Sequence, residues 1–179
     1  MNIIGLIPAR MASSRFPGKP LAPILGIPII GHVYFRSKMS PILSEVYVAT
    51  CDREIAEYID SIGGKAIMTL VTHERASDRC AEAIVKIEKV KDKKVDYIVM
   101  IQGDEPMLMP EMINDLVEPV LKDPSIRITN LINEITTEEE FNNSNVVKVV
   151  MDLNDFALYF SREPIPSKRK YNGKIPMWK

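Results

Sequence analysis

Short apolar segments alternate along this chain with stretches in which apolar residues recur at helical spacing. The apolar segments have the length of β-strands, and the first, IIGLI, reads as a strand buried on both faces. This alternation predicts an α/β fold with a mainly parallel sheet. The predicted strands are residues 3–7, 46–49, 65–68, 97–101, 128–132, 146–151 and 157–160. The predicted helices are residues 29–38, 53–61, 78–90 and 110–122.

Local signals mark the ends of two predicted helices. Ser77 is the expected N-cap of the third helix, and Asp78 follows it near the positive end of the helix dipole. Gly63 and Gly64 follow the second helix, as is common after a helix C-terminus. The polar segment 136–145 predicts a short helix and a surface loop.

Composition and charge narrow the class of protein. The chain has 179 residues, 46% of them hydrophobic, which is enough for one domain with a sizeable core. A formal net charge of −1 gives no general reason to expect nucleic acid as a partner. Cys51 and Cys80 form no CxxC pair, so we expect no zinc site and a reducing compartment. We see no signal peptide, and Pro and Gly interrupt the longest apolar stretch, which predicts a cytoplasmic protein without membrane insertion.

The last residues of the chain are unusually apolar. Residues 171–179 include Ile175, Met177 and Trp178, which are costly to leave in water. We therefore expect another buried strand to begin here and the domain to continue beyond Lys179.

The segment GLIPARMASSRFPGKPL, residues 5–21, runs from the first predicted strand into a loop. It carries Arg10, Arg15 and Lys19 among small residues. Small residues let backbone N–H groups approach phosphate oxygens, and the cations neutralise their charge. The segment matches neither GxxxxGK[ST] nor GxGxxG. Its position at the carboxyl end of a strand, where open α/β sheets bind ligands, favours a triphosphate-binding loop over a solvated basic loop.

A second motif, IQGDEP at residues 101–106, lies at the carboxyl end of the strand predicted at 97–101. Asp104 is the expected Mg²⁺ ligand, because this ion prefers carboxylate, water and phosphate oxygens. Gln102 offers both a donor and an acceptor to a base or a sugar. The alternative is that Asp104 only caps the helix that starts near Pro110.

Charged side chains at three other places in the sequence are further candidates for ligand binding. Asp78 and Arg79, at the start of the third helix, either face the ligand or only cap the helix. Lys148 lies within an apolar strand, a costly place for a charge unless it meets an anion or reaches the edge. Arg162 follows the strand at 157–160 and is suited to bind a carboxylate through two hydrogen bonds. The alternative for both cations is a stem along apolar surface with the charged head in water.

Together these motifs resemble the sugar-activating cytidylyltransferase family. The family's IPAR-x-x-S-x-R-x-x-x-K-P-L pattern is present as IPARMASSRFPGKPL, and its QGDEP motif is unchanged. The segments VATCD, NVVKVV and ALYFSREPIP complete the similarity in the same order over nearly the whole chain. The resemblance implies a Rossmann-like three-layer nucleotidyltransferase fold of the nucleotide-diphospho-sugar transferase type. It also implies that residues 1–179 form a single nucleotidyltransferase domain lacking its C-terminal part, usually in a homodimer.

The resemblance further implies a reaction. CTP and a 3-deoxy-2-ulosonic acid, in the most similar members 3-deoxy-manno-octulosonic acid (Kdo), are joined into a CMP-sugar, with Mg²⁺ as cofactor and pyrophosphate as the second product. The alternative substrate is another nonulosonic acid such as a sialic acid. The alternative function is a truncated, non-catalytic nucleotide-binding remnant that binds a protein.

Individual roles are implied in the same way. The nucleotide-binding residues implied by the resemblance are Ala9, Arg10, Ser14, Arg15, Lys19, Asp78 and Arg79. Arg10, Lys19 and Asp104 are implied to be catalytic, with Asp104 as the metal ligand. Gln102 and Arg162 are implied to contact the sugar acid.

This chain departs from the family pattern just before Asp78. Family members usually have Ser-Gly-Thr there, and this chain has Arg75, Ala76 and Ser77. The loop has therefore lost a glycine and gained a cation.

Overall fold

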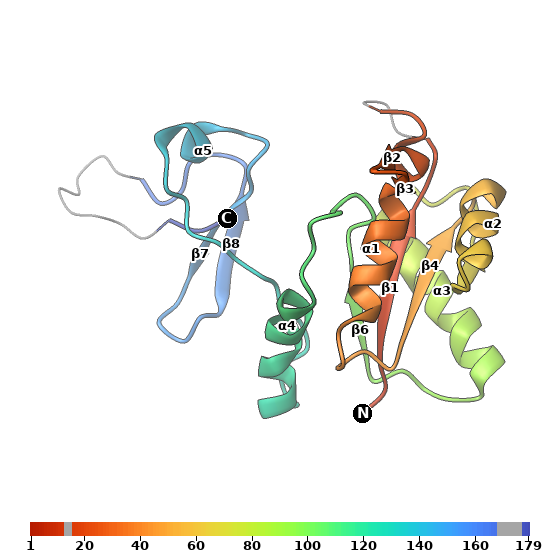
Figure 1. Cartoon of the computed structure of the whole chain (residues 1–179). Helices are drawn as coiled ribbons and strands as arrows, with labels where there is room; N and C mark the ends of the chain where they lie inside the picture. The colour runs from red at the N-terminus through yellow and green to blue at the C-terminus, as the bar shows by residue number, and fades with distance from the viewer. Residues whose placement is uncertain (13–15, 168–176) are drawn as a thin grey trace. The chain divides into compact units, whose positions relative to one another are not determined.

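The computed structural model describes residues 1–12, 16–167 and 177–179. The chain divides into two compact units, Met1–Thr129 and Asn130–Lys179, which are coloured in sequence order in Figure 1. The single domain expected from the sequence stays a prediction. No described helix is both long and apolar enough to cross a membrane.

The first unit is built on a four-stranded parallel sheet in the order β5-β4-β1-β6. Its strands are β1 (Ile3–Ala9), β4 (Glu45–Thr50), β5 (Ala66–Met68) and β6 (Tyr97–Met100). The apolar residues of the central strand β1 are almost completely buried, which explains its continuous apolar sequence. The four strands predicted in this part of the chain, and their parallel arrangement, are confirmed.

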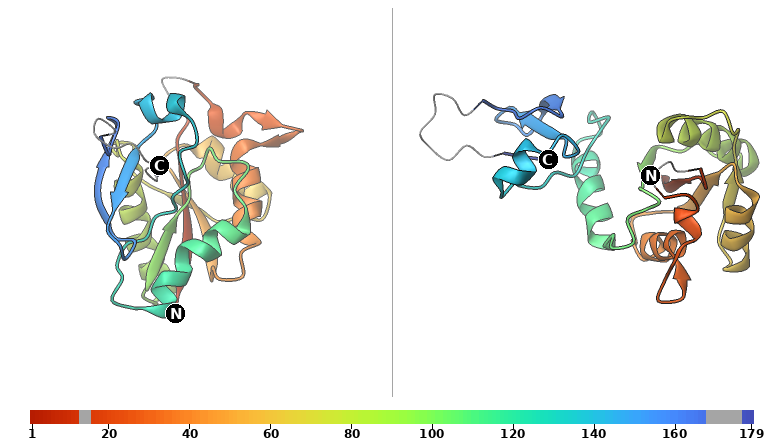
Figure 2. Two further views of the ribbon diagram at one scale, coloured as in Figure 1. Left: turned by 90° about the vertical axis from the view of Figure 1, so that its left-hand side faces the viewer. Right: turned by 90° about the horizontal axis from the view of Figure 1, so that it is seen from above.

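Helices cover both faces of this sheet. They are α1 (Ile29–Lys38), α2 (Arg53–Ser61), α3 (Ala76–Lys91) and α4 (Pro110–Lys122). Because side chains alternate along a strand, Ile3 and Ile7 of β1 pack in one core with α1, α2 and α4, and Ile4 and Leu6 pack in another with α3. The view from above in Figure 2 shows α1 and α3 on opposite sides of the sheet. The predicted three-layer α/β class is therefore confirmed.

After β1, the chain forms three short elements that the hydrophobic pattern did not predict. They are the 3₁₀-helix η1 (Lys19–Leu21) and the antiparallel pair β2 (Pro23–Ile24) and β3 (Ile27–Pro28). Each is too short to leave a periodic apolar signal.

Two predictions of local structure are wrong. Arg75 has extended backbone angles (φ −101°, ψ 144°), so α3 begins at Ala76 with Arg75, and not Ser77, as its N-cap. Residues 128–132 form no strand, and Ile128 is 82% exposed. An apolar run becomes a strand only where a neighbouring strand takes up its backbone hydrogen bonds, and no described strand does so here.

The second unit contains α5 (Glu138–Asn142) and an antiparallel pair, β7 (Lys148–Met151) and β8 (Ala157–Ser161). Thr137 caps α5 by accepting a hydrogen bond from the Glu140 backbone N–H at 3.1 Å, which confirms the short helix expected in this polar segment. Near the end of the chain, Trp178 forms isolated antiparallel bridges with residues of this unit.

Candidate functional site

The carboxyl ends of β1, β4 and β6 meet at one edge of the first unit's sheet. Ala9 of β1 lies opposite Thr50 of β4, and β6 pairs along the other side of β1. The segments that leave these strands, beginning with Arg10, Cys51 and Ile101, therefore start from neighbouring positions. This is the edge at which open α/β sheets bind ligands.

Gly103 lets the segment after β6 approach the end of β1. A Cβ atom at this position would lie 2.8 Å from the carbonyl oxygen of Pro8, closer than real Cβ contacts occur. The backbone N–H of Ile101 also donates to the carbonyl of Leu6 at 2.8 Å. The close approach therefore requires glycine, and it places Asp104 beside the end of β1.

Two residues predicted from separate motifs are in direct contact. Lys19 Nζ lies 2.7 Å from Asp104 Oδ2, and the two side chains are 34% and 50% exposed. An ion pair this exposed contributes at most about 1 kcal/mol, so both groups remain available to a ligand. The alternative that Asp104 caps the next helix fails, because the N-cap of α4 is Met109.

Hydrogen bonds hold the base of the loop between β1 and η1. The Gly18 N–H donates to the Met11 carbonyl at 3.0 Å, and the Met11 N–H donates to Asp52 Oδ2 at 2.8 Å. The Asp52 N–H in turn donates to Thr50 Oγ1 at 3.1 Å. Gly18 adopts a positive φ of 74°, which glycine tolerates without strain. The loop is therefore anchored to the end of β4.

Asp52 is a residue that the sequence reasoning did not assign. The signal was present, because its carboxylate ends the VATCD motif directly after a buried strand. Ser14 and Arg15, the two predicted phosphate-binding residues within the loop, lie outside the described residues.

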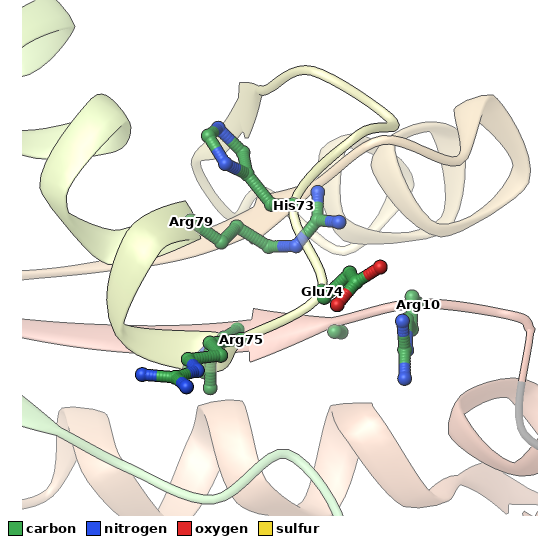
Figure 3. Close-up of a pocket in the computed structure, with 8 residues that line it drawn as sticks. Arg10, His73, Glu74, Arg75 and Arg79 are labelled. Carbon is green, nitrogen blue, oxygen red and sulfur yellow. The ribbon is translucent and has the colours of Figure 1, made fainter.

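A pocket lies between the end of β1 and the start of α3 (Figure 3). Its lining residues are Pro8, Ala9, Arg10, His73, Glu74, Arg75, Ala76 and Arg79. Arginines outnumber the one carboxylate, so the wall is rich in positive charge and in hydrogen-bond donors. Figure 3 shows Arg10 and Arg75 at opposite ends of the pocket, with Glu74 and Arg79 between them.

Arg79 is the most informative side chain of this pocket. It is 3% exposed, and its Nη1 donates to Thr69 Oγ1. Its Nη2 has no hydrogen-bond partner in the described part of the chain. A buried donor left unpaired costs about 1–3 kcal/mol, a cost that an acceptor atom of a bound ligand would remove.

Glu82 of α3 clamps the loop that forms one wall of the pocket. Its Oε2 accepts from the Leu70 N–H at 2.9 Å and lies 2.5 Å from His73 Nε2, while its Oε1 lies 2.6 Å from Lys86 Nζ. Hydrogen bonds from Lys86 and from the Leu70 N–H, followed by that from His73, lower the pKa of Glu82 to about 2. His73 therefore serves this clamp.

Comparison with known proteins decides the family. The cytidylyltransferase family model matches residues 4–177. The chain belongs to the cytidylyltransferase family.

Several relatives in this family carry the same name. The chain is 46% identical over 173 residues to the 3-deoxy-manno-octulosonate cytidylyltransferase of Geobacter metallireducens, covering 96% of this chain and 66% of that protein. It is 45% identical over 178 residues to the enzyme of that name from Syntrophus aciditrophicus, covering 99% and 71%. The chain thus spans about two thirds of the length of these curated relatives.

Comparison with solved structures supports the same family. The structure of CMP:2-keto-3-deoxy-manno-octonic acid synthetase complexed with CTP matches with a TM-score of 0.91 and 38% identity, over 99% of this chain and 70% of that one. A 4-diphosphocytidyl-2C-methyl-D-erythritol synthase matches with a TM-score of 0.61 at 13% identity, which shows the shared fold alone.

In the second unit of this cytidylyltransferase chain, Lys148 is completely buried. Its Nζ donates to the backbone carbonyls of Asn143 at 2.7 Å, Val146 at 2.9 Å and Arg162 at 2.7 Å. These carbonyls use all three ammonium donors. Lys148 therefore neither meets an anion nor extends its head into water, and both expectations for it are wrong. The cation instead holds together three segments of its own unit.

Arg162 is exposed at the end of β8. Its carbonyl accepts from Lys148, and its own Nη1 donates to the Ser144 carbonyl at 2.9 Å. Both its main chain and its side chain are thus bound to the turn before β7. Its predicted contact with the sugar acid stays a prediction.

Two other predicted site residues lie at the expected edge without marked contacts. Gln102 and Asp78 are exposed, and neither side chain has a hydrogen bond or ion pair with the described residues. Asp78 lies in the first turn of α3 but does not line the pocket. Their roles stay predictions.

Proposed function

We propose that this chain carries the nucleotide-binding part of an enzyme that transfers CMP from CTP to 3-deoxy-manno-octulosonic acid and releases pyrophosphate. The observation that carries the proposal is the contact of Lys19 with Asp104 at the edge of the sheet where a pocket is lined by Arg10 and by Arg79, whose buried Nη2 has no partner among the described residues. The relatives' names support the same reaction, and the most similar of the solved structures described above contains CTP.

In this proposal the loop after β1 binds the triphosphate. Arg10, Arg15 and Lys19 compensate the negative charge of the phosphates, and the neutral Ser14 hydroxyl donates a hydrogen bond to a phosphate oxygen. The anomeric hydroxyl of the sugar attacks the α-phosphorus and forms the new O–P bond, and its proton is released to solvent water. The bond between the α-phosphorus and the oxygen that bridges it to the β-phosphate breaks, and its electron pair leaves on pyrophosphate. Fixed positive charge stabilises the pyrophosphate that leaves, so positioning and electrostatics supply most of the catalysis.

Asp104 fits a magnesium ion. Its carboxylate is half-exposed beside the proposed phosphate loop, and Mg²⁺ is commonly held by one or two carboxylates with water and substrate phosphates. The described residues contain no group of three or more His, Cys, Asp and Glu suited to a metal, so phosphate and water oxygens would complete the coordination. When bound, the ion would neutralise phosphate charge and orient the α-phosphate. Lys19 is then free to turn from Asp104 to a phosphate oxygen.

The sugar acid and the assembly complete the proposal. Gln102 and Arg162 are the proposed contacts to the sugar acid, and a homodimer is the proposed assembly. The names of the relatives favour 3-deoxy-manno-octulosonic acid over a sialic acid, and a catalytic function over a nucleotide-binding remnant.

The test is pyrophosphate release from CTP and Mg²⁺ with a panel of ulosonic acids, run beside the other three nucleoside triphosphates. We expect release with CTP and one acid, and a fall of roughly 100-fold in kcat for Asp104→Asn. Glu105→Gln is the matched control, because Glu105 is the adjacent exposed carboxylate and has no proposed role. Equal release with all four nucleotides, or an unchanged Asp104→Asn, would contradict the proposal.

A further inference from the structure

Arg75 is an unfavourable residue for the start of a helix. It is the N-cap of α3, and its side chain makes no capping hydrogen bond. N-caps favour Ser, Thr, Asp and Asn, because their oxygens accept hydrogen bonds from the free N–H groups of the first turn. An arginine has no acceptor, and its charge is repelled by the positive end of the helix dipole. Arg75 therefore weakens the start of the helix that it caps.

The pocket beside Arg75 calls for a ligand with acceptor atoms. Arg79 lines the pocket, and its buried Nη2 has no hydrogen-bond partner among the described residues. Arg75 is exposed on the same pocket, and its side chain makes no hydrogen bond or ion pair with the described part of the chain. Free N–H groups at the start of α3 add further donors. Apart from the Glu74 carboxylate, this wall of the pocket is thus dominated by hydrogen-bond donors.

The two ends of the pocket differ in their surroundings. Arg10, at one end, continues into the loop proposed to bind the triphosphate, and Arg75 lies at the opposite end (Figure 3). A nucleotide whose phosphates lie at Arg10 therefore extends its nucleoside toward Arg75. The group that meets Arg75 is then the base.

Cytosine suits a donor-rich wall better than uracil does. The O2 and N3 atoms of cytosine are adjacent acceptors, and the planar fork of a guanidinium donates to two such atoms at once. Uracil carries a hydrogen on N3, so the same guanidinium would face a donor and leave its own N–H unpaired.

We propose that Arg75 is a specificity-determining residue that donates hydrogen bonds to the O2 and N3 edge of cytosine. The loss of helix stability at this N-cap is offset by selectivity for CTP over UTP. The inference rests on the proposed function, because it requires a nucleoside triphosphate in this pocket.

The test compares the wild-type chain with Arg75→Ser and Arg75→Lys, using calorimetric binding of CTP, CMP and UTP. We expect Arg75→Ser to weaken CTP and CMP binding equally, by about 10-fold, and to change UTP binding less than about 2-fold. Arg75→Lys keeps the charge without the fork, so it should lose the same selectivity. Without ligand, Arg75→Ser should raise the melting temperature by a few degrees (about 2–4 °C), because serine is a good N-cap. Arg127→Ser removes an exposed arginine outside the pocket and should change neither property.

The outcomes separate the two proposals. A wild-type chain that binds neither CTP nor CMP defeats the proposed function itself. If the wild type binds CTP, an equal loss of CTP and UTP affinity in Arg75→Ser overturns base recognition by Arg75. Unchanged CTP affinity in Arg75→Ser, or full selectivity in Arg75→Lys, overturns it as well.

Discussion

Two lysines of this chain, one in each unit, show how differently the fold can use the same charge. Lys19 is 34% exposed and contacts one carboxylate, Asp104, which is itself half-exposed. Lys148 is completely buried, and its three donors are all bound to backbone carbonyls. A lysine that shares one exposed contact can exchange it for a phosphate oxygen, whereas one with every donor satisfied in the interior cannot. Lys19 is therefore available to bind a ligand, whereas Lys148 stabilises its own unit.

The largest effect is expected from Lys148→Met. The substitution leaves three carbonyls without their donor, so we expect a loss of roughly 3 kcal/mol in the free energy of unfolding. Urea unfolding measures this loss. Lys122→Met is the control, because Lys122 is 72% exposed and, among the residues that the structure describes, pairs only with Glu118. This substitution should change stability by less than about 0.5 kcal/mol. Equal losses of stability in the two variants would contradict the structural role assigned to Lys148.

A smaller effect is expected when Asp104 is displaced from Lys19. In Gly103→Ala the new Cβ meets the Pro8 carbonyl, so the segment must move, at a cost of about 1–2 kcal/mol in stability and about 10-fold in CTP affinity. Gly63→Ala is a matched control, because Gly63 has open space around it but a φ of 70° that strains alanine. We expect a similar stability loss there without a change in CTP binding. Reduced affinity in both variants would show that general destabilisation, and not the position of Asp104, is responsible.

The smallest effect concerns the clamp that holds the exposed site in place. Glu82→Gln should lower the free energy of unfolding at pH 7 by about 1 kcal/mol, because charge-assisted hydrogen bonds become neutral ones. Folding lowers the pKa of Glu82 from 4.5 to about 2, so its stabilisation is complete above about pH 4.5 and is lost as the pH falls toward 2. The difference from wild type should therefore shrink over that interval. The exposed Glu57→Gln is the control and should change the free energy of unfolding at pH 7 by less than about 0.5 kcal/mol. A difference for Glu82→Gln that stays constant over that interval would contradict the clamp.

Much of the first unit was predictable because its helices and strands carry strong local signals. The predicted limits of the helices at 29–38, 53–61 and 110–122 agree with the structure. The positions of the motifs also predicted that Lys19 and Asp104 lie at the same edge of the sheet, because parallel strands align their carboxyl ends, and the two side chains are in contact there.

Other features depend on partners that a sequence does not reveal. The charge of Lys148 in an apolar strand predicted an unusual environment, but its acceptors are main-chain carbonyls, which every residue carries. The N-cap at Arg75 was missed because the residue breaks the usual capping preference. Such a break is expected where a side chain serves a ligand at the expense of local structure.

Calorimetric titration of CTP with Mg²⁺ into the wild-type chain and into Lys19→Met tests the central claim most directly. We expect the wild type to bind CTP and Lys19→Met to bind it at least about 10-fold more weakly, because Asp104 then faces the phosphates without its cation. Without ligand, the free energies of unfolding of the two proteins should differ by less than about 1 kcal/mol, since the ion pair is exposed. Equal CTP affinity in the two proteins would contradict the assignment of Lys19 to the triphosphate site.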